Sequence, residues 1–166
     1  MTINTESRRL ANLMIGHGMS VLFVGLVAGV MLVFSLLGVV TLWPLPVWEV
    51  LVPGSTRGWQ AAHVGGILNG VMIGGAALLA LHLQLEGRRM WWVGYGMIIT
   101  GWANTIFYWA GLLAPNRGLS VAATPFGPGD LAGAISFFGG GTGMLFTFVA
   151  AFILARAGFE KARRTS

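Results

Sequence analysis

His63 is followed by Gly66, Gly70 and Gly74, which lie three, seven and eleven residues further along the chain. In a helix these spacings place the glycines on nearly the same face as the imidazole. Imidazole is a common metal ligand, and a face without side chains admits a flat ring, so the pattern fits a macrocycle whose metal is bound by His63 Nε2. Small residues four apart are also the usual contact between membrane helices. The spacing alone does not choose between these interpretations.

Three polar residues in apolar surroundings accompany this histidine: Asn69, Asn104 and Tyr108. If their two segments run antiparallel, all three come to a depth similar to that of His63, at about 1.5 Å of rise per residue. Asn104 and Tyr108 are four residues apart and therefore share a helix face. They are candidates to contact whatever His63 holds, and bridging between helices by buried polar groups is the alternative.

The other two histidines carry weaker indications of chemistry. His82 lies one helical turn before Glu86, close to two arginines, which predicts a solvated position at a membrane surface. His17 stands between Gly16 and Gly18, a setting that favours hydrogen-bonded packing over metal binding.

The elements that must position these residues are set by the composition, which is 55% hydrophobic and 9% charged with a mean hydropathy of +0.77. That balance excludes a soluble domain, and long uninterrupted apolar runs fit helices rather than the strands of a barrel. We predict an all-α, polytopic membrane protein, a four-transmembrane-helix bundle forming one domain over residues 1–166. The predicted helices cover approximately 14–42, 59–85, 91–113 and 130–155.

The basic residues predict the topology of these helices. Eight of the ten flank the N-terminus, the loop between the second and third helices, and the C-terminus: Arg8, Arg9, Arg88, Arg89, Arg156, Lys161, Arg163 and Arg164. The positive-inside rule then places both termini in the cytoplasm. No basic patch is interleaved with aromatic residues, so we predict contact with membrane lipid and none with nucleic acid. The first helix lacks the features of a cleaved signal peptide and is expected to stay attached.

The absence of cysteine and the positions of the acidic residues exclude several kinds of catalysis. The chain has no cysteine, which excludes thiol nucleophiles and thiolate metal ligands. All five acidic residues lie at or outside the ends of the predicted helices: Glu6, Glu49, Glu86, Asp130 and Glu160. No buried carboxylate pair is therefore expected for acid–base catalysis or a proton relay.

The chain resembles the styrene oxide isomerase family, small membrane enzymes of bacterial styrene degradation, from the Gly16-His17-Gly18 triplet to Asp130. The ordered blocks that carry the resemblance are Val52-Pro53-Gly54-Ser55, Gly58-Trp59, Ala62-His63-Val64-Gly65, Leu68-Asn69-Gly70, Gly101-Trp102-Ala103-Asn104, Phe107-Tyr108, Pro115-Asn116-Arg117-Gly118-Leu119 and Phe126-Gly127-Pro128-Gly129-Asp130. The family pattern has an acidic residue just before the Gly101 block, where this chain has Thr100. The last helix shares little beyond hydrophobicity and a basic tail.

The resemblance implies an isomerase in the bacterial inner membrane, assembled as a homotrimer with ferric haem b between neighbouring subunits. His63 matches the axial iron ligand, and Gly66 and Gly70 fall in the cofactor-binding segment. The family converts aryl epoxides such as styrene oxide to aldehydes, here phenylacetaldehyde, by a Meinwald rearrangement with a 1,2-hydride shift, the iron acting as a Lewis acid. Tyr108 and Asn69 match the positions that hold the epoxide, and a styrene monooxygenase is a candidate partner.

Two alternatives from other classes stay open at this point. One is a b-type haem protein for electron transfer or sensing, which ordinarily needs a second strong axial ligand. The other is a haem-free helical module in which the glycines serve packing alone. Arg117, in an outer loop, is a candidate partner for a haem propionate.

Overall fold

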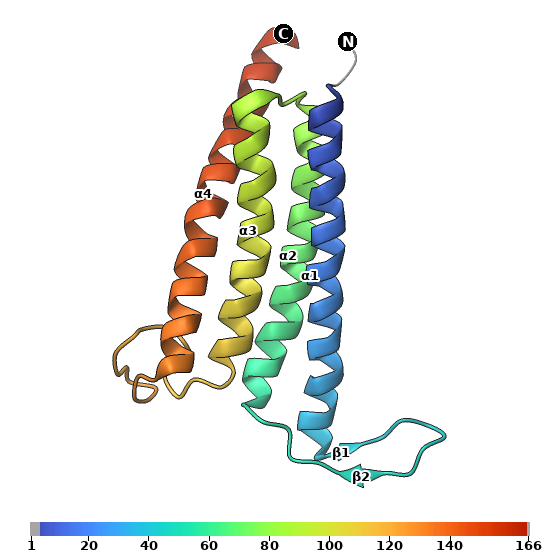
Figure 1. Ribbon diagram of the computed structural model, residues 1–166, viewed down its shortest axis with the longest axis vertical. Coiled ribbons are helices and arrows are strands. Elements are labelled where there is room, and N and C mark those ends of the chain that lie inside the picture. Colours follow the sequence, from blue (N-terminus) through green and yellow to red (C-terminus); the bar gives the residue numbers. More distant parts are fainter. Residues whose placement is uncertain (1–3, 166) are drawn as a thin grey trace.

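The computed structural model describes residues 4–165, and four long helices account for most of that range (Figure 1). They are α1 (Thr5–Leu37), α2 (Thr56–His82), α3 (Gly87–Gly111) and α4 (Leu131–Thr165). The all-helical architecture predicted from the apolar segments is confirmed, although several helix ends differ from the predicted ones.

The outer helices are longer than their apolar segments because polar residues extend them. The side chain of Asn4 accepts a hydrogen bond from the Glu6 amide at 3.0 Å and caps α1, which therefore begins well before the predicted start at position 14. α4 continues past the predicted end at position 155 into a polar tail. At its other end the Asp130 carboxylate accepts from the Gly133 amide at 2.6 Å and caps the helix.

The helices form an open row rather than a closed bundle. α2 and α3 occupy the middle, α1 packs against α2 and also reaches α3, and α4 packs mainly against α3. Over residues 4–165 no contact joins α1 to α4. Both termini lie at the same end of the row as the α2–α3 turn, and the two longer connections lie at the other end (Figure 1).

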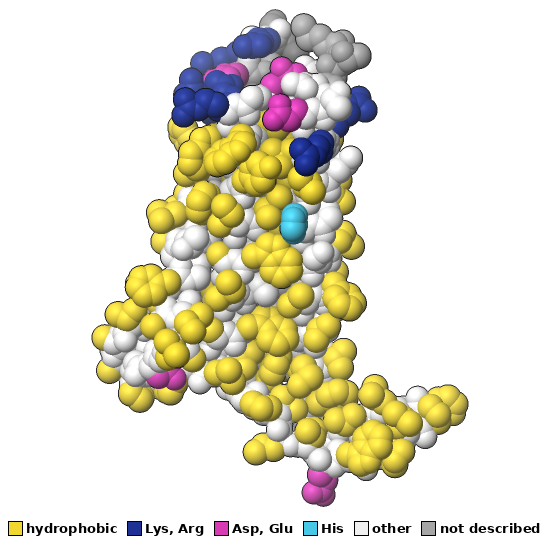
Figure 2. All heavy atoms as spheres, in the orientation of Figure 1, with side chains coloured by type: hydrophobic (Ala, Val, Ile, Leu, Met, Phe, Trp, Pro, Cys, Tyr) yellow, Lys and Arg dark blue, Asp and Glu magenta, His cyan; other side chains and the backbone are white. Residues whose placement is uncertain are grey.

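α1, α2 and α4 are each long and apolar enough to cross a membrane. α3 has 25 residues, about 37 Å at 1.5 Å per residue, but its glycine, asparagine, threonine and tyrosine residues make it less apolar. It contacts all three other helices and supplies the polar residues between them. Figure 2 shows an apolar surface along the length of the helices, with Lys and Arg gathered at the end that holds the termini.

The connection between α1 and α2 contains a small hairpin that the sequence analysis did not predict. β1 (Val39–Val40) pairs antiparallel with β2 (Trp48–Glu49). α1 ends where Gly38 adopts a left-handed conformation, φ 67°, that glycine accepts without strain. The hairpin projects sideways from the helices, and Trp43 at its tip is 95% exposed (Figure 1).

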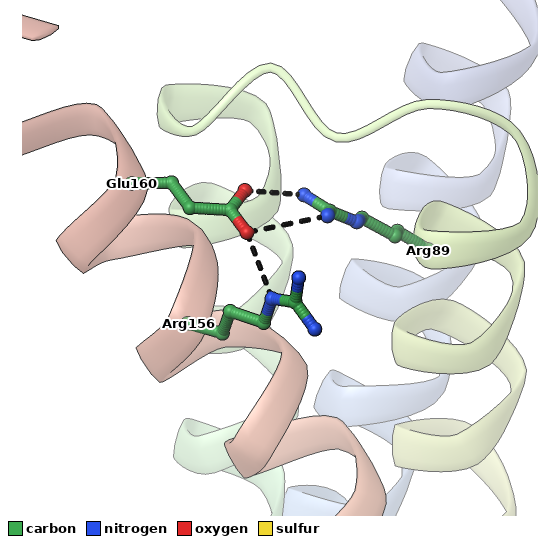
Figure 3. Close-up of polar contacts among 3 residues, drawn as sticks. All are labelled: Arg89, Arg156 and Glu160. Atoms are coloured by element: carbon green, nitrogen blue, oxygen red, sulfur yellow. Dashed lines mark hydrogen bonds and ion pairs between the residues drawn. The ribbon is translucent and has the colours of Figure 1, made fainter.

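An ion-pair cluster fastens α4 to α3 near the termini (Figure 3). The Glu160 carboxylate accepts from Arg89 Nη1 at 2.7 Å and from Arg156 Nε at 2.8 Å. Arg156 and Glu160 are four residues apart on α4, so the cluster also stabilises the last turns of that helix.

Candidate functional site

His63 points from α2 toward α1. Its Nδ1 lies 2.9 Å from the carbonyl oxygen of Gly25, and the ring is half-buried. A carbonyl oxygen only accepts hydrogen bonds, so Nδ1 carries a proton, and in the neutral imidazole Nε2 then keeps its lone pair. A Cβ at Gly29 would lie 2.5 Å from His63 Nδ1, so the imidazole needs a glycine at this position of α1. The arrangement is the one that fixes a metal-binding imidazole through its other nitrogen.

The glycine face predicted to lie bare is covered by α1 at two of its three positions. A Cβ at Gly66 would lie 2.5 Å from the Cα of Gly25, and one at Gly70 would lie 2.6 Å from the carbonyl oxygen of Gly18. Gly74 has open space beside it. Gly66 and Gly70 therefore serve the close helix contact that was the alternative interpretation, and this contact brings the Gly25 carbonyl to His63.

Asn69 and Tyr108 lie between α2 and α3. The buried Asn69 donates from Nδ2 to the Gly65 carbonyl at 2.7 Å, and its Oδ1 accepts from Asn104 Nδ2 at 2.8 Å. The Tyr108 ring covers Gly65 so closely that a Cβ there would collide with it. These contacts confirm that positions 69 and 104 share a depth, as the antiparallel course of the two segments predicted.

His63 and the Asn69–Tyr108 pair do not converge within one chain. A helix turns about 100° per residue, so Gly65 lies about 200° and Asn69 about 240° round α2 from His63. The imidazole accordingly contacts α1, whereas the amide and the phenol lie on the side of α3. Equal depth therefore does not imply a shared face, and contact of Asn69, Asn104 and Tyr108 with a group held by His63 stays a prediction.

A cavity of about 140 Å³ opens beside Tyr108 at the end of the row away from the termini. Ala61, Phe107 and Leu112 supply apolar walls, and Arg57 and Arg117 also line the cavity. The Arg117 guanidinium also stacks 4.0 Å above the Phe126 ring. A small apolar molecule fits this composition, with the phenol as its polar contact.

Comparison with known proteins identifies the chain's relatives. The family profile described as Styrene oxide isomerase matches residues 10–159. The chain is 37% identical over 147 residues to a curated Styrene-oxide isomerase from Pseudomonas fluorescens, an alignment covering 89% of this chain and 85% of that protein. The chain belongs to the styrene oxide isomerase family. It is therefore an enzyme, and the predicted family membership is confirmed.

Thr100, which stands where the family resemblance implies an acidic residue, faces α4. Thr100 is fully buried and donates to the Gly143 carbonyl at 3.2 Å. Its hydroxyl also lies 3.2 Å from that of Thr147. The hydroxyl pair thus ties α3 to α4 one helical turn from Asn104.

His17 and His82 lie away from His63 in this isomerase. His17 accepts a hydrogen bond from Trp102 Nε1 at 3.2 Å, which confirms a packing role. Gly29, beside His63, lies twelve residues after His17 on α1, so the two imidazoles are separated by about 18 Å along the helix axis. His82 is exposed at the end of α2, as predicted. One chain therefore does not place His17 and His63 on a common metal.

Sequence reasoning missed Gly25, Gly29 and Gly65, which shape the site of this isomerase without any reactive group. Gly25 and Gly29 are four residues apart in an apolar helix, the spacing of a close helix contact, and this signal was available. Gly65 carries no such signal, because only the packing of Tyr108 shows that a side chain there is excluded.

Proposed function

We propose that this isomerase converts aryl epoxides to aldehydes, with haem b bound through Nε2 of His63. The side chains available as metal ligands fit haem b. Over residues 4–165 no three His, Cys, Asp or Glu side chains gather into a metal site, so the protein offers one imidazole. A single nitrogen ligand suits a metal whose remaining ligands come mainly from a macrocycle. The observation that carries the proposal is the bond from His63 Nδ1 to Gly25, which leaves Nε2 as a lone-pair donor.

The position of His63 supports a group shared between protomers. The α2 surface between His63 and Gly65 is apolar and exposed, with Val64, Leu68 and Val71 47%, 62% and 60% exposed. A flat apolar cofactor can cover such a surface. We propose a homotrimer in which His63 of one protomer and the Asn69–Tyr108 pair of its neighbour face the same haem. In this assembly His63 and the Asn69–Tyr108 pair act on the same haem, although they lie on different sides of α2 within each chain.

When bound, ferric haem b supplies a Lewis acid for the epoxide oxygen. In the proposed rearrangement the benzylic C–O bond breaks, hydride moves from the adjacent carbon to the benzylic carbon, and a carbonyl forms. No electrons are gained or lost, so no cosubstrate is consumed. Tyr108 Oη and Asn69 Nδ2 donate hydrogen bonds to the oxygen as it gains negative charge. Apolar walls such as Phe107 and Leu112 exclude the water that would convert the benzylic cation to a diol.

Purified protein in detergent tests the proposal directly. We expect a haem absorption spectrum and the conversion of styrene oxide to phenylacetaldehyde without any added cosubstrate. A folded but colourless protein would refute the haem site. Haem-loaded protein that leaves aryl epoxides unchanged would refute the isomerisation and favour electron transfer or sensing.

Tyr108→Phe is expected to lower kcat for styrene oxide by about 10- to 100-fold, because it removes one hydrogen bond to the developing oxyanion. Haem content should stay at the wild-type level, because the phenol is not the proposed iron ligand and the bond from His63 to Gly25 is unchanged. Tyr95, the only other tyrosine in the sequence, packs against Trp91 toward the opposite end of α3 and provides the matched control Tyr95→Phe. Equal rates for the two variants would contradict the role of Tyr108.

We further propose four membrane spans in the bacterial inner membrane, with cytoplasmic termini. Because the chain has no cysteine, single cysteines report topology without background. We expect Glu86→Cys, in the α2–α3 turn, to react with a membrane-impermeant maleimide only after the cells are opened. Ala123→Cys, in the α3–α4 loop, should react in intact cells. The reverse pattern would overturn the orientation, and labelling of both sites in intact cells would contradict an α3 that spans the membrane.

A further inference from the structure

The hydrogen bonds around Asn69 fix which way its amide points. One amide atom lies 2.7 Å from the Gly65 carbonyl oxygen, which only accepts, so that atom is Nδ2. The other atom is then Oδ1, and it lies 2.8 Å from the side chain of Asn104. The Asn104 atom in this contact must be a donor and is therefore Nδ2. The orientation of both amides follows from one backbone carbonyl.

This arrangement leaves Asn69 with one uncommitted N–H. The side-chain amide has two N–H groups, and one of them is held by Gly65. Oδ1 is occupied by Asn104 and is turned toward α3. The second N–H is the donor that the proposed function assigns to the epoxide oxygen. The hydrogen bonds to Gly65 and to Asn104 together set the direction of this second N–H.

Asn104 is itself held in place by α4. Its Oδ1 lies so close to Gly143 that a Cβ at that position would collide with it. Thr100 donates to the Gly143 carbonyl at 3.2 Å and holds α4 against α3 at this level, while Thr147 bonds to the same carbonyl at 2.7 Å within α4. A contact chain thus runs from α4 through Asn104 to Asn69 on α2, although α4 barely touches α2 itself.

We propose that Asn104 is a positioning residue, which acts through Asn69 by keeping Oδ1 of that amide toward α3 and its free N–H toward the substrate oxygen. The inference rests on the proposed function, because it assumes that Asn69 donates to that oxygen. Asn104 contacts no reacting atom in this account. Its contribution therefore disappears when Asn69 is removed.

Asn104→Asp tests the polarity of this contact with almost no change in shape. At a pH high enough to ionise it, the aspartate only accepts, so it repels Asn69 Oδ1 and favours a flipped amide that turns its NH₂ group toward α3. We expect kcat for styrene oxide to fall by about 10- to 100-fold with little change in KM, because a donor to the transition-state oxygen is lost. Asn104→Leu, which leaves Oδ1 unpartnered without reversing it, should give a smaller loss in the same direction.

A double-mutant cycle separates positioning from a general structural role. If Asn104 acts through Asn69, the variant Asn69→Ala/Asn104→Asp should be no slower than Asn69→Ala alone, whereas independent roles give effects that multiply. Fluoride bound to the ferric protein provides a readout independent of turnover, because it is an anion that accepts hydrogen bonds. We expect Asn69→Ala and Asn104→Asp each to weaken fluoride binding by about tenfold, the effect of one lost hydrogen bond.

The control is Thr105→Val, one residue along α3 from Asn104, whose hydroxyl bonds to Gly101 of its own helix at 2.8 Å. It should keep wild-type kcat, haem content and fluoride affinity. Two results would overturn the positioning role of Asn104 and leave the proposed function intact. One is a double variant in which the two losses multiply, and the other is wild-type kcat in Asn104→Asp when Asn69→Ala is slow. Wild-type protein that does not isomerise styrene oxide would refute the proposed function, and a fast Asn69→Ala variant would refute the role of Asn69 and this inference together.

Discussion

Replacing His63 with alanine is expected to abolish haem binding and, with it, the isomerisation of styrene oxide. His63 is the only histidine on the α1-facing side of α2 whose Nδ1 is held by a backbone carbonyl, among the residues that the structure describes. The variant loses the proposed axial ligand and leaves the space beside Gly29 empty. The ratio of Soret absorbance to protein absorbance at 280 nm measures the loss, and we expect it to fall to background.

His17→Ala and His82→Ala serve as matched controls for this prediction. The first removes only the partner of the Trp102 indole, and the second changes an exposed ring at the end of α2. Both should keep the wild-type haem content. Added imidazole should restore part of the Soret band in His63→Gly, because free imidazole can replace the missing ligand. A normal Soret band in folded His63→Ala protein would reject the assignment of the ligand.

Gly65→Ala is expected to lower kcat by about 100-fold or more while haem stays bound, because the added methyl group collides with the Tyr108 ring and displaces the phenol from the substrate. The effect should exceed that of Tyr108→Phe, since the ring moves as well as the hydroxyl. The proposed axial ligand His63 and its bond to Gly25 are unchanged, so the Soret band should keep its intensity. Steady-state kinetics with styrene oxide, together with haem content per protomer, measure both expectations.

The matched control is Gly158→Ala in α4, where a Cβ meets nothing within 4 Å and alanine favours the helix. This variant should retain wild-type kcat and be at least as stable. Gly65→Ala protein with normal turnover would show that Tyr108 can move without consequence, which contradicts its proposed contact with the epoxide oxygen. Loss of haem from Gly65→Ala would instead show that haem binding also depends on the position of the Tyr108 ring.

Much of the fold was predictable because apolar length and antiparallel depth are visible in the sequence. The Asn69–Asn104 hydrogen bond confirms a depth comparison that needed only the rise per residue. It was harder to predict which side of α2 each residue occupies. His63 and Asn69 are six residues apart, and the 3.6-residue period places them on different sides. The comparison of depth took no account of this angle.

Other features depend on partners that are distant in the chain. The Gly25 carbonyl reaches His63 only because Gly66 lets two backbones approach, and a single helix sequence does not show which neighbour covers it. The hairpin strands have two residues each, too few for a period-2 pattern to stand out. The start of α1 was missed because helix formation continues through capped polar turns, whereas hydropathy marks only the apolar part.

The partner of His63 Nδ1 also bears on the electronic character of the proposed iron site. A neutral peptide oxygen draws the imidazole proton less strongly than an aspartate or glutamate would, so the ring keeps little imidazolate character and is a comparatively poor electron donor. An iron that receives less electron density from its axial base attracts an oxygen lone pair more strongly. The glycine contact between α1 and α2 would thereby make the iron a stronger Lewis acid, in addition to holding His63 in place.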